Sequence, residues 1–204
     1  MGVLIKGLRG PSGEFGALGV VEVNSSAVDV FRFVADVEQQ PTWHHGVKHS
    51  KVIGRNGNQK DVHQVLSWNF LALRGDMHLQ LAQLEDPKAL TIKTELTKGT
   101  MMRNFRSRVG VRQKAPGKCE LEMEMFVQPN IFVPFGIRGM VGGQVRRQLR
   151  GVLSALQEKC ERRSEEQQQQ QPPWQPQWQP HWQPQWQQLN PLFSWLNPLV
   201  AAAS

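Results

Sequence analysis

The segment Val30 to Trp43, VFRFVADVEQQPTW, constrains the fold of this chain more than any other stretch. It follows a short strand-like run, Gly19 to Val23, and precedes a long strand-rich region. Ser26 and Asp29 form an acidic variant of a helix capping box, and the apolar residues after them recur at helical spacing. Pro41 closes this helix or breaks it into a second short one. This order is typical of a curved sheet that wraps around a C-terminal helix and encloses an apolar cavity.

Six further strands are expected after Trp43, because runs of strand-forming residues alternate there with turn residues. They span Val47 to Arg55, Asp61 to Leu73, Asp76 to Leu84, Ala89 to Leu96, Met101 to Arg112 and Lys118 to Val127. Together with the opening strand they predict a sheet of seven strands.

The last hairpin of this sheet shows the clearest alternation. Its second strand buries Leu121, Met123, Met125 and Val127 and exposes three glutamates, and its first strand is expected to bury Met101, Phe105, Val109 and Val111. A turn centred on Ala115 would set Arg106 opposite Glu124 and Arg108 opposite Glu122. The arginine row is therefore interpreted as a solvated salt-bridge face, which weakens a nucleic-acid interpretation.

A helical period runs from Phe135 to Arg163 and predicts the long helix that the sheet wraps. Its first part contains four glycines, each of which costs about 1 kcal/mol relative to alanine inside a helix. Two explanations remain open: the glycines mark a later helix start, or they leave room beneath the helix and let its end move. The glycines are Gly136, Gly139, Gly142 and Gly143.

Charge and composition divide the chain into three parts. The net charge is +7, and residues 167–204 contain no Lys, Arg, Asp or Glu. We expect an N-terminal extension over residues 1–15, one domain over residues 16–163, and a disordered Gln/Pro/Trp-rich tail over residues 164–204 with an apolar end at Leu189 to Val200. The two cysteines form no disulfide framework, and no apolar run is long enough to cross a bilayer.

Residues that could perform catalysis are scarce. The six histidines show no metal-binding spacing, so neither a metal nor another cofactor is expected. Asp36 and Glu38 could act as acid or base beside a histidine, although solvation of a helix end is their simpler role. There is no phosphate-binding glycine loop and no nucleophile elbow.

Four segments carry a family resemblance: VFRFVADVEQQPTW, the strand Trp68 to Phe70 with Gly75 beyond it, the strand Met102 to Phe105, and Val127 to Pro129 leading through Pro134 into the last helix. Together they resemble the START-like (SRPBCC) superfamily, and within it the polyketide cyclase/dehydrase and lipid transport group, nearest to coenzyme Q-binding START-domain proteins. The resemblance implies an α+β helix-grip fold, a seven-stranded antiparallel curved sheet in the order β-α-α-β6-α around a long C-terminal helix.

The resemblance also implies a function. We expect non-catalytic binding or transport of a hydrophobic small molecule, a polyprenyl quinone such as ubiquinone or a related lipid, in support of respiration or quinone biosynthesis. The two cysteines favour a reduced intracellular compartment. A mitochondrion or chloroplast is suggested by the resemblance alone, and peripheral membrane contact is a further expectation. One alternative is a polyketide aromatase/cyclase that acts in the same cavity. A second is a basic adaptor that binds RNA or protein through its surface and tail.

The candidate ligand-binding residues combine the inward phases of strands and helix with the apolar loop before that helix. The cavity residues are Trp43, Trp68, Phe70, Phe105, Met123, Met125, Phe132, Met140, Val141 and Val145. The polar selectors of a head group are His44 and Arg103, and no catalytic residue is expected.

Overall fold

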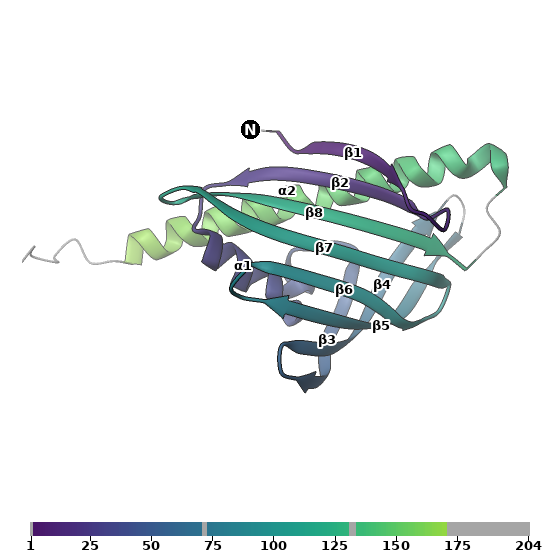
Figure 1. Cartoon of the computed structure of the whole chain (residues 1–204), viewed down its shortest axis with the longest axis horizontal. Coiled ribbons are helices and arrows are strands. Elements are labelled where there is room, and N and C mark those ends of the chain that lie inside the picture. The colour runs from purple at the N-terminus through teal and green to yellow at the C-terminus, as the bar shows by residue number, and fades with distance from the viewer. Residues whose placement is uncertain (1, 71–72, 131–133, 171–204) are drawn as a thin grey trace, which may run out of the picture. The chain divides into compact units, whose positions relative to one another are not determined.

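Eight antiparallel strands form one curved sheet in the computed structural model, which describes residues 2–70, 73–130 and 134–170 (Figure 1). The strands are β1 (Leu4–Arg9), β2 (Phe15–Val23), β3 (Val47–Asn56), β4 (Gln59–Phe70), β5 (Leu73–Asp86), β6 (Thr91–Gly99), β7 (Met102–Ala115) and β8 (Lys118–Pro129). The helices are α1 (Ala27–Ala35), α2 (Arg138–Gln170) and the 3₁₀ helices η1 (Val37–Thr42) and η2 (Phe135–Ile137).

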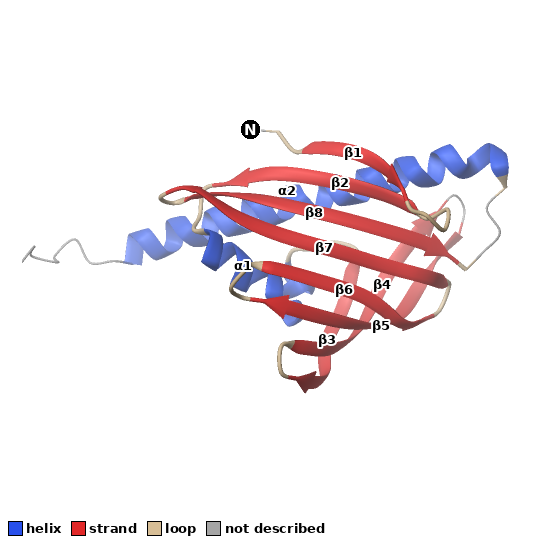
Figure 2. Cartoon of the chain, viewed as in Figure 1, coloured by secondary structure: helices blue, strands red, loops and turns tan. Residues whose placement is uncertain are grey.

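The strand order is β1-β2-β8-β7-β6-β5-β4-β3, so β2 and β8, which are far apart in sequence, lie side by side. The sheet curves strongly enough that β3 and β4 turn away from the other strands (Figure 2). Helix α2 packs on β1 and β2, where the side chains of Ile5, Leu149 and Leu153 crowd above Gly19. A Cβ atom at Gly19 would lie 2.4 Å from Leu153 Cδ1, so the absence of a side chain there permits this close packing. The helix-grip architecture expected from the sequence is confirmed.

The predicted strand count was one too low. Residues 4–9, assigned to an N-terminal extension, form β1, which pairs with β2 from Leu4 opposite Val20 to Arg9 opposite Phe15. The connecting turn is stabilised by Glu14, whose buried carboxylate accepts hydrogen bonds from Asn104 Nδ2 at 2.7 Å and Arg106 Nη2 at 3.3 Å. An additional strand therefore precedes the β-α-α-β6-α arrangement.

Helix α1 begins as its sequence predicts. The Oγ atom of Ser26 accepts a hydrogen bond from the backbone N–H of Asp29 at 3.1 Å, which caps the helix. The chain breaks at Asp36 and continues as η1, which contains Pro41. A second short helix therefore follows α1, but the break lies five residues before Pro41, which was expected to cause it.

The β7–β8 hairpin keeps its predicted faces but not its predicted register. Paired residues are Arg108 with Glu124 and Arg112 with Glu120, a shift of two from the expected partners. This shift in register has two causes. The turn consists of Pro116 and Gly117, and Gly117 has a φ of +69°. The pairing is also irregular between Gln113 and Ala115. Met101, expected to be buried, precedes β7 with a φ of +60° and is exposed.

Helix α2 begins at Arg138, so Gly139, Gly142 and Gly143 lie within it and do not mark a later start. It continues to Gln170, beyond the predicted domain end at Arg163. Within the described residues, no helix is both long and apolar enough to cross a membrane. The predicted disordered tail lies outside the described residues from position 171 onward.

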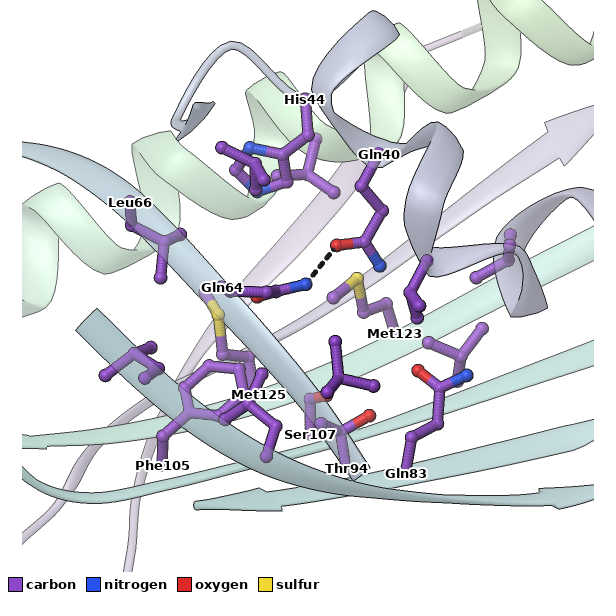
Figure 3. A pocket seen from close by; sticks show the side chains of 18 of the residues that line it. Gln40, His44, Gln64, Leu66, Gln83, Thr94, Phe105, Ser107, Met123 and Met125 are labelled. Atoms are coloured by element: carbon purple, nitrogen blue, oxygen red, sulfur yellow. Dashed lines mark hydrogen bonds between the residues drawn. The ribbon is translucent and has the colours of Figure 1, made fainter. Parts of the chain in front are cut away.

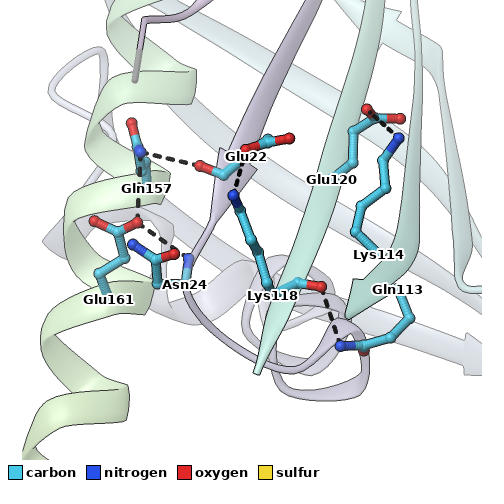
Figure 4. A network of polar contacts seen from close by, with 8 residues as sticks. All are labelled: Glu22, Asn24, Gln113, Lys114, Lys118, Glu120, Gln157 and Glu161. Carbon is cyan, nitrogen blue, oxygen red and sulfur yellow. Dashed lines mark hydrogen bonds and ion pairs between the residues drawn. The ribbon is translucent and has the colours of Figure 1, made fainter. Parts of the chain in front are cut away.

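Hydrogen bonds attach the second part of α2, which includes Gln157, Glu161 and Ser164, to the end of the sheet. The side-chain N–H of Gln157 donates to the carbonyl oxygen of Glu22 at 2.9 Å, and Glu161 Oε1 accepts from the backbone N–H of Asn24 at 3.1 Å (Figure 4). Ser164 Oγ donates to Ser25 Oγ at 2.8 Å. This part of the helix is therefore held by hydrogen bonds as well as by apolar packing.

Candidate binding cavity

A cavity of about 150 Å³ lies between the sheet on one side and α1, η1 and α2 on the other (Figure 3). Its walls are mainly aliphatic and thioether side chains from six strands, β3 to β8, and two α-helices. The apolar lining residues are Val34, Val37, Trp43, Val47, Val62, Leu66, Met77, Leu79, Leu81, Ile92, Met102, Phe105, Val109, Met123, Met125, Val127, Val152 and Leu156. Such a surface favours an apolar occupant, because water in it would find few hydrogen-bond partners.

Two glutamines lie on the strand walls of this cavity. Gln64, on β4, uses both N–H groups of its side-chain amide. It donates to Gln40 Oε1 at 2.6 Å (Figure 3) and to Ser50 Oγ at 3.2 Å. No hydrogen bond to Gln64 Oε1 occurs among the described residues. This oxygen can accept a hydrogen bond from a ligand.

Gln83, on β5, follows the same pattern. Its amide nitrogen donates to the carbonyl oxygen of Ala35 at 3.2 Å, at the end of α1, and to Glu85 Oε1 at 2.9 Å. Lys60 completes this arrangement, because its Nζ atom donates to the Ala35 carbonyl and forms an ion pair with Glu85. The amide group of Gln83 thus fixes the end of α1, and its Oε1 atom has no partner among the described residues.

His44 lies where the cavity approaches the surface. Its Nδ1 atom accepts a hydrogen bond from the backbone N–H of Gly46 at 3.1 Å, so the neutral ring carries its proton on Nε2. Burial lowers the pKa of His44 below its ordinary value of 6.5, and the nearby charge of His45 lowers it slightly further. Gln148 on α2 also lines the cavity and is exposed, which places it at the rim.

Trp43 closes the cavity beside His44 and is only 4% exposed. Its ring packs against Phe33 and His44, with centroid distances of 5.9 and 5.8 Å. Within the described part of the chain, the buried Nε1–H of Trp43 has no hydrogen-bond partner. An unpaired buried donor costs free energy, so an acceptor on a bound molecule would relieve this cost.

The predicted site residues fall into four groups, the last of which is exposed. The structure brings Trp43, His44, Phe105, Met123 and Met125 together in one lining. Val141 and Val145, on α2, are buried in the hydrophobic core but do not belong to this lining. Trp68 and Phe70 belong to β4, but their side chains lie outside what the structure describes, as does Phe132.

Met140 and Arg103 are placed away from the cavity. Met140 is 54% exposed because it is one residue from the inward-facing Val141, about 100° around the helix. Arg103 is exposed at the irregularity between Met102 and Asn104, where the alternation of β7 changes phase. Both Met102 and Phe105 therefore face the cavity although three positions separate them.

Sequence reasoning missed the polar lining on the strands, which consists of Gln64, Gln83, Thr94 and Ser107. The signal was present in the alternation. Gln64 lies between Val62 and Leu66 on one strand face, and Gln83 follows Leu79 and Leu81. A polar residue in phase with buried neighbours indicates a polar group directed at the interior.

The chemistry of the lining is limited. Among the described residues His44 is its one titratable side chain, and no Asp, Glu, Lys or Arg lines it. No group of three or more His, Cys, Asp or Glu residues suited to a metal ion occurs in the described part of the chain. The arrangement can enclose an apolar molecule and direct a few hydrogen bonds to it.

Solved structures share this fold at low sequence identity. A START superfamily protein from Mycobacterium smegmatis is 20% identical, with a TM-score of 0.63 over 74% of this chain and 99% of that chain. The Zhui aromatase/cyclase from Streptomyces sp. R1128 is 13% identical, with a TM-score of 0.64 over 79% and 96%. A STAR-related lipid transfer protein from Xanthomonas axonopodis is 13% identical, with a TM-score of 0.62 over 78% and 93%.

No curated protein matches the chain. Residues 19–161 match the family model for polyketide cyclase/dehydrase and lipid transport, which covers well over half of the sequence. The chain therefore belongs to the polyketide cyclase/dehydrase and lipid transport family.

Proposed function

We propose that this protein binds a hydrophobic small molecule, a quinone or related isoprenoid, in the cavity and carries it without converting it. The observation that supports this most directly is the lining, in which apolar walls surround a few uncharged hydrogen-bonding groups. Ligand pockets for apolar molecules have this composition. The family contains lipid-binding members as well as cyclases, so a carrier is consistent with the family.

The volume of the cavity limits which part of a ligand it holds. Pockets for drug-sized ligands measure roughly 300–1,000 Å³, whereas an apolar cavity of about 150 Å³ can accept a molecule the size of benzene. The cavity of this protein, at about 150 Å³, thus suits the ring of a quinone. An isoprenoid tail would leave past the rim at His44 and Gln148, or the helix would move to admit it.

The unpaired polar atoms suit such a ring. Gln64 Oε1 and Gln83 Oε1 can accept hydrogen bonds, while Gln40 Nε2 and Trp43 Nε1 can donate them. A quinone ring bears carbonyl oxygens, and its reduced form bears hydroxyl groups. The lining therefore offers partners to both redox forms.

A cyclase is the second candidate, and His44 is the observation that favours it. The ring lines the cavity, and its lowered pKa keeps it neutral at pH 7, so Nε2–H can donate a hydrogen bond to a substrate carbonyl. Nδ1, however, is already engaged by Gly46. Without a carboxylate or lysine in the described lining, a base for proton abstraction is missing, which favours the carrier.

The test introduces one charge into the cavity. Met123→Arg is expected to abolish binding of a fluorescent quinone analogue, because a guanidinium without an acidic partner opposes an apolar ligand. Glu122→Arg is the matched control, because the neighbouring side chain is exposed on the opposite face of β8. Should Met123→Arg fail to fold, Ser107→Phe provides a neutral alternative that fills the cavity.

Binding is followed by fluorescence titration, and the sheet is monitored by circular dichroism. Wild-type binding by both Met123→Arg and Ser107→Phe would remove the cavity from the function. Mass spectrometry of molecules that co-purify with the wild-type chain, compared with Ser107→Phe, identifies the natural ligand class. Turnover of a polyketide-like substrate that His44→Gln abolishes would instead support the cyclase.

A further inference from the structure

Positive charge is segregated along helix α2. Residues 134–157 contain four arginines and no acidic residue, whereas residues 158–166 contain Glu158, Glu161, Glu165 and Glu166 beside three basic residues. Arg146, Arg147 and Arg150 are all exposed. None of these three has a carboxylate within 4.0 Å among the described residues.

Strand β1 adds a further cation to this region. A Cβ atom added to Gly7, on β1, would lie 3.0 Å from Arg146 Nη1. A Cβ atom added to Gly142, one turn earlier on α2, would lie 3.9 Å from the side chain of Phe15, which pairs with Arg9 of β1. These contacts show that β1 runs antiparallel to α2, so Arg9 lies about one helical turn from Arg146. The basic face is defined here as Arg9, Arg146, Arg147 and Arg150.

This charge distribution does not stabilise the helix. Arg146 and Arg150 are separated by four residues and Arg147 and Arg150 by three, so like charges repel at each spacing. In the second part of α2, Glu158 precedes Arg162 by four residues, which is the favourable order. The cost of the basic face would be offset by an anionic partner outside the chain.

We propose that the basic face docks the protein on an anionic lipid bilayer, next to the rim of the cavity. Two observations favour a bilayer over a nucleic acid or an acidic protein. Met140 is 54% exposed and, seven residues before Arg147, lies on the same side of the helix, where it can enter the apolar boundary of a membrane. Gln148, at the rim, adjoins Arg147, so an apolar ligand can pass between cavity and bilayer without crossing water. The docking does not depend on which ligand occupies the cavity.

The experiment compares two double variants of the full chain with the same net charge. Arg147→Gln/Arg150→Gln removes two cations of the basic face, and Lys159→Gln/Arg162→Gln removes two from the second part of the helix. Each arginine near an anionic surface contributes about a fivefold factor in affinity. We expect about 30-fold weaker binding of the first variant to vesicles of phosphatidylcholine with phosphatidylglycerol, and a change within about twofold for the second.

Co-sedimentation measures the binding, with pure phosphatidylcholine vesicles as the uncharged reference. Met140→Ser is expected to lower the fraction that stays bound at high salt, because salt screens charge but not apolar insertion. Equal loss in both double variants would assign the binding to net charge and overturn the proposal. Tighter binding to duplex DNA than to the anionic vesicles, or no binding to these vesicles, would also overturn it.

The same variants are titrated with the quinone analogue in the absence of vesicles. Their affinity is expected to match that of the wild type, because none of the replaced residues lines the cavity. Vesicle binding without quinone binding would uphold the basic face and reject the quinone ligand. Quinone binding without vesicle binding would do the reverse.

Discussion

The two halves of helix α2 are attached to the sheet in different ways. Residues 151–170 bury Leu153 and Leu156 almost completely and add the hydrogen bonds of Gln157, Glu161 and Ser164 to the β2 end of the sheet. Residues 139–150 are attached through the buried side chains of Val141, Val145 and Leu149. Within the described structure, no side chain of residues 139–150 forms a hydrogen bond or ion pair with the sheet. This first half also contains three glycines.

This difference indicates that one end of the helix fixes the fold while the other can open. Local opening is easiest where polar contacts are few and helix propensity is low. The rim residue Gln148 belongs to the weakly held half. Movement of this half would enlarge the cavity without unfolding the sheet.

The largest effect is expected from core truncation in the second half. Leu153→Ala should lower the free energy of unfolding by about 2–5 kcal/mol, because it leaves a void at a fully buried position. Val141→Ala removes fewer atoms and should cost about 1–2 kcal/mol, mainly through local opening. Urea unfolding measures the global change, and amide hydrogen exchange in residues 139–150 measures the local one. If Val141→Ala raised amide hydrogen exchange equally along the whole of α2, the two halves of the helix would not differ in local stability.

Replacing glycines should stiffen the first half. Gly139→Ala with Gly143→Ala should stabilise the helix by about 1 kcal/mol per site, because an added Cβ atom meets nothing closer than 3.9 Å at either position. We expect slower exchange of the quinone analogue in stopped-flow experiments with little change in affinity. Gly151→Ala is the control, since its Cβ also enters open space but in the second half. Equal slowing by the control would contradict a gate in the first half.

A smaller effect should follow from the polar contacts. Gln157→Leu removes the hydrogen bond to the Glu22 carbonyl and should cost about 1 kcal/mol. Gln144→Leu changes the same residue type in the first half, where the described structure shows no hydrogen bond of its side chain, and should stay within about 0.5 kcal/mol. Thermal unfolding compares the two variants, and similar losses would show that the polar network does not distinguish the halves.

The smallest effect concerns pH at the rim. Because burial lowers the pKa of His44 in the folded state, the unfolded chain binds more protons between that lowered value and about 6.5. Its contribution to stability is complete above about pH 6.5 and declines as pH falls toward the lowered pKa. His44→Gln should flatten this part of the stability profile, measured by urea unfolding between pH 5 and 8. An unchanged profile would place the sensitivity at another group.

Alternation and capping explain how much of the fold was predictable. The regular pattern around Met123 predicted the faces of β8, and Ser26 predicted the start of α1. The register of the β7–β8 hairpin was less predictable. A two-residue turn and an irregularity change which residues pair without changing which side chains are buried. Strand β1 was missed because its six residues include a glycine and two basic residues, a composition also typical of an extension.

The site was predictable only in its apolar part. Met125 and Phe105 follow from strand phase, whereas Gln83 resembles a surface residue unless its phase is compared with Leu81. Met140 was assigned to an inward-facing position of the helix, but the observed helical phase turns its side chain outward. Side-chain direction on a helix changes by about 100° per residue, so a one-residue difference separates the interior from the surface.

Strand β1 also protects the sheet from unwanted association. It covers the backbone hydrogen-bonding edge of β2, a strand in which most side chains are buried, and itself presents a short outer edge with Lys6 and Arg9. Short, charged edges resist pairing with other chains. Proteolysis or trimming that removed residues 1–10 would leave the long apolar strand β2 as the new edge, so aggregation is the expected failure of such a truncated protein.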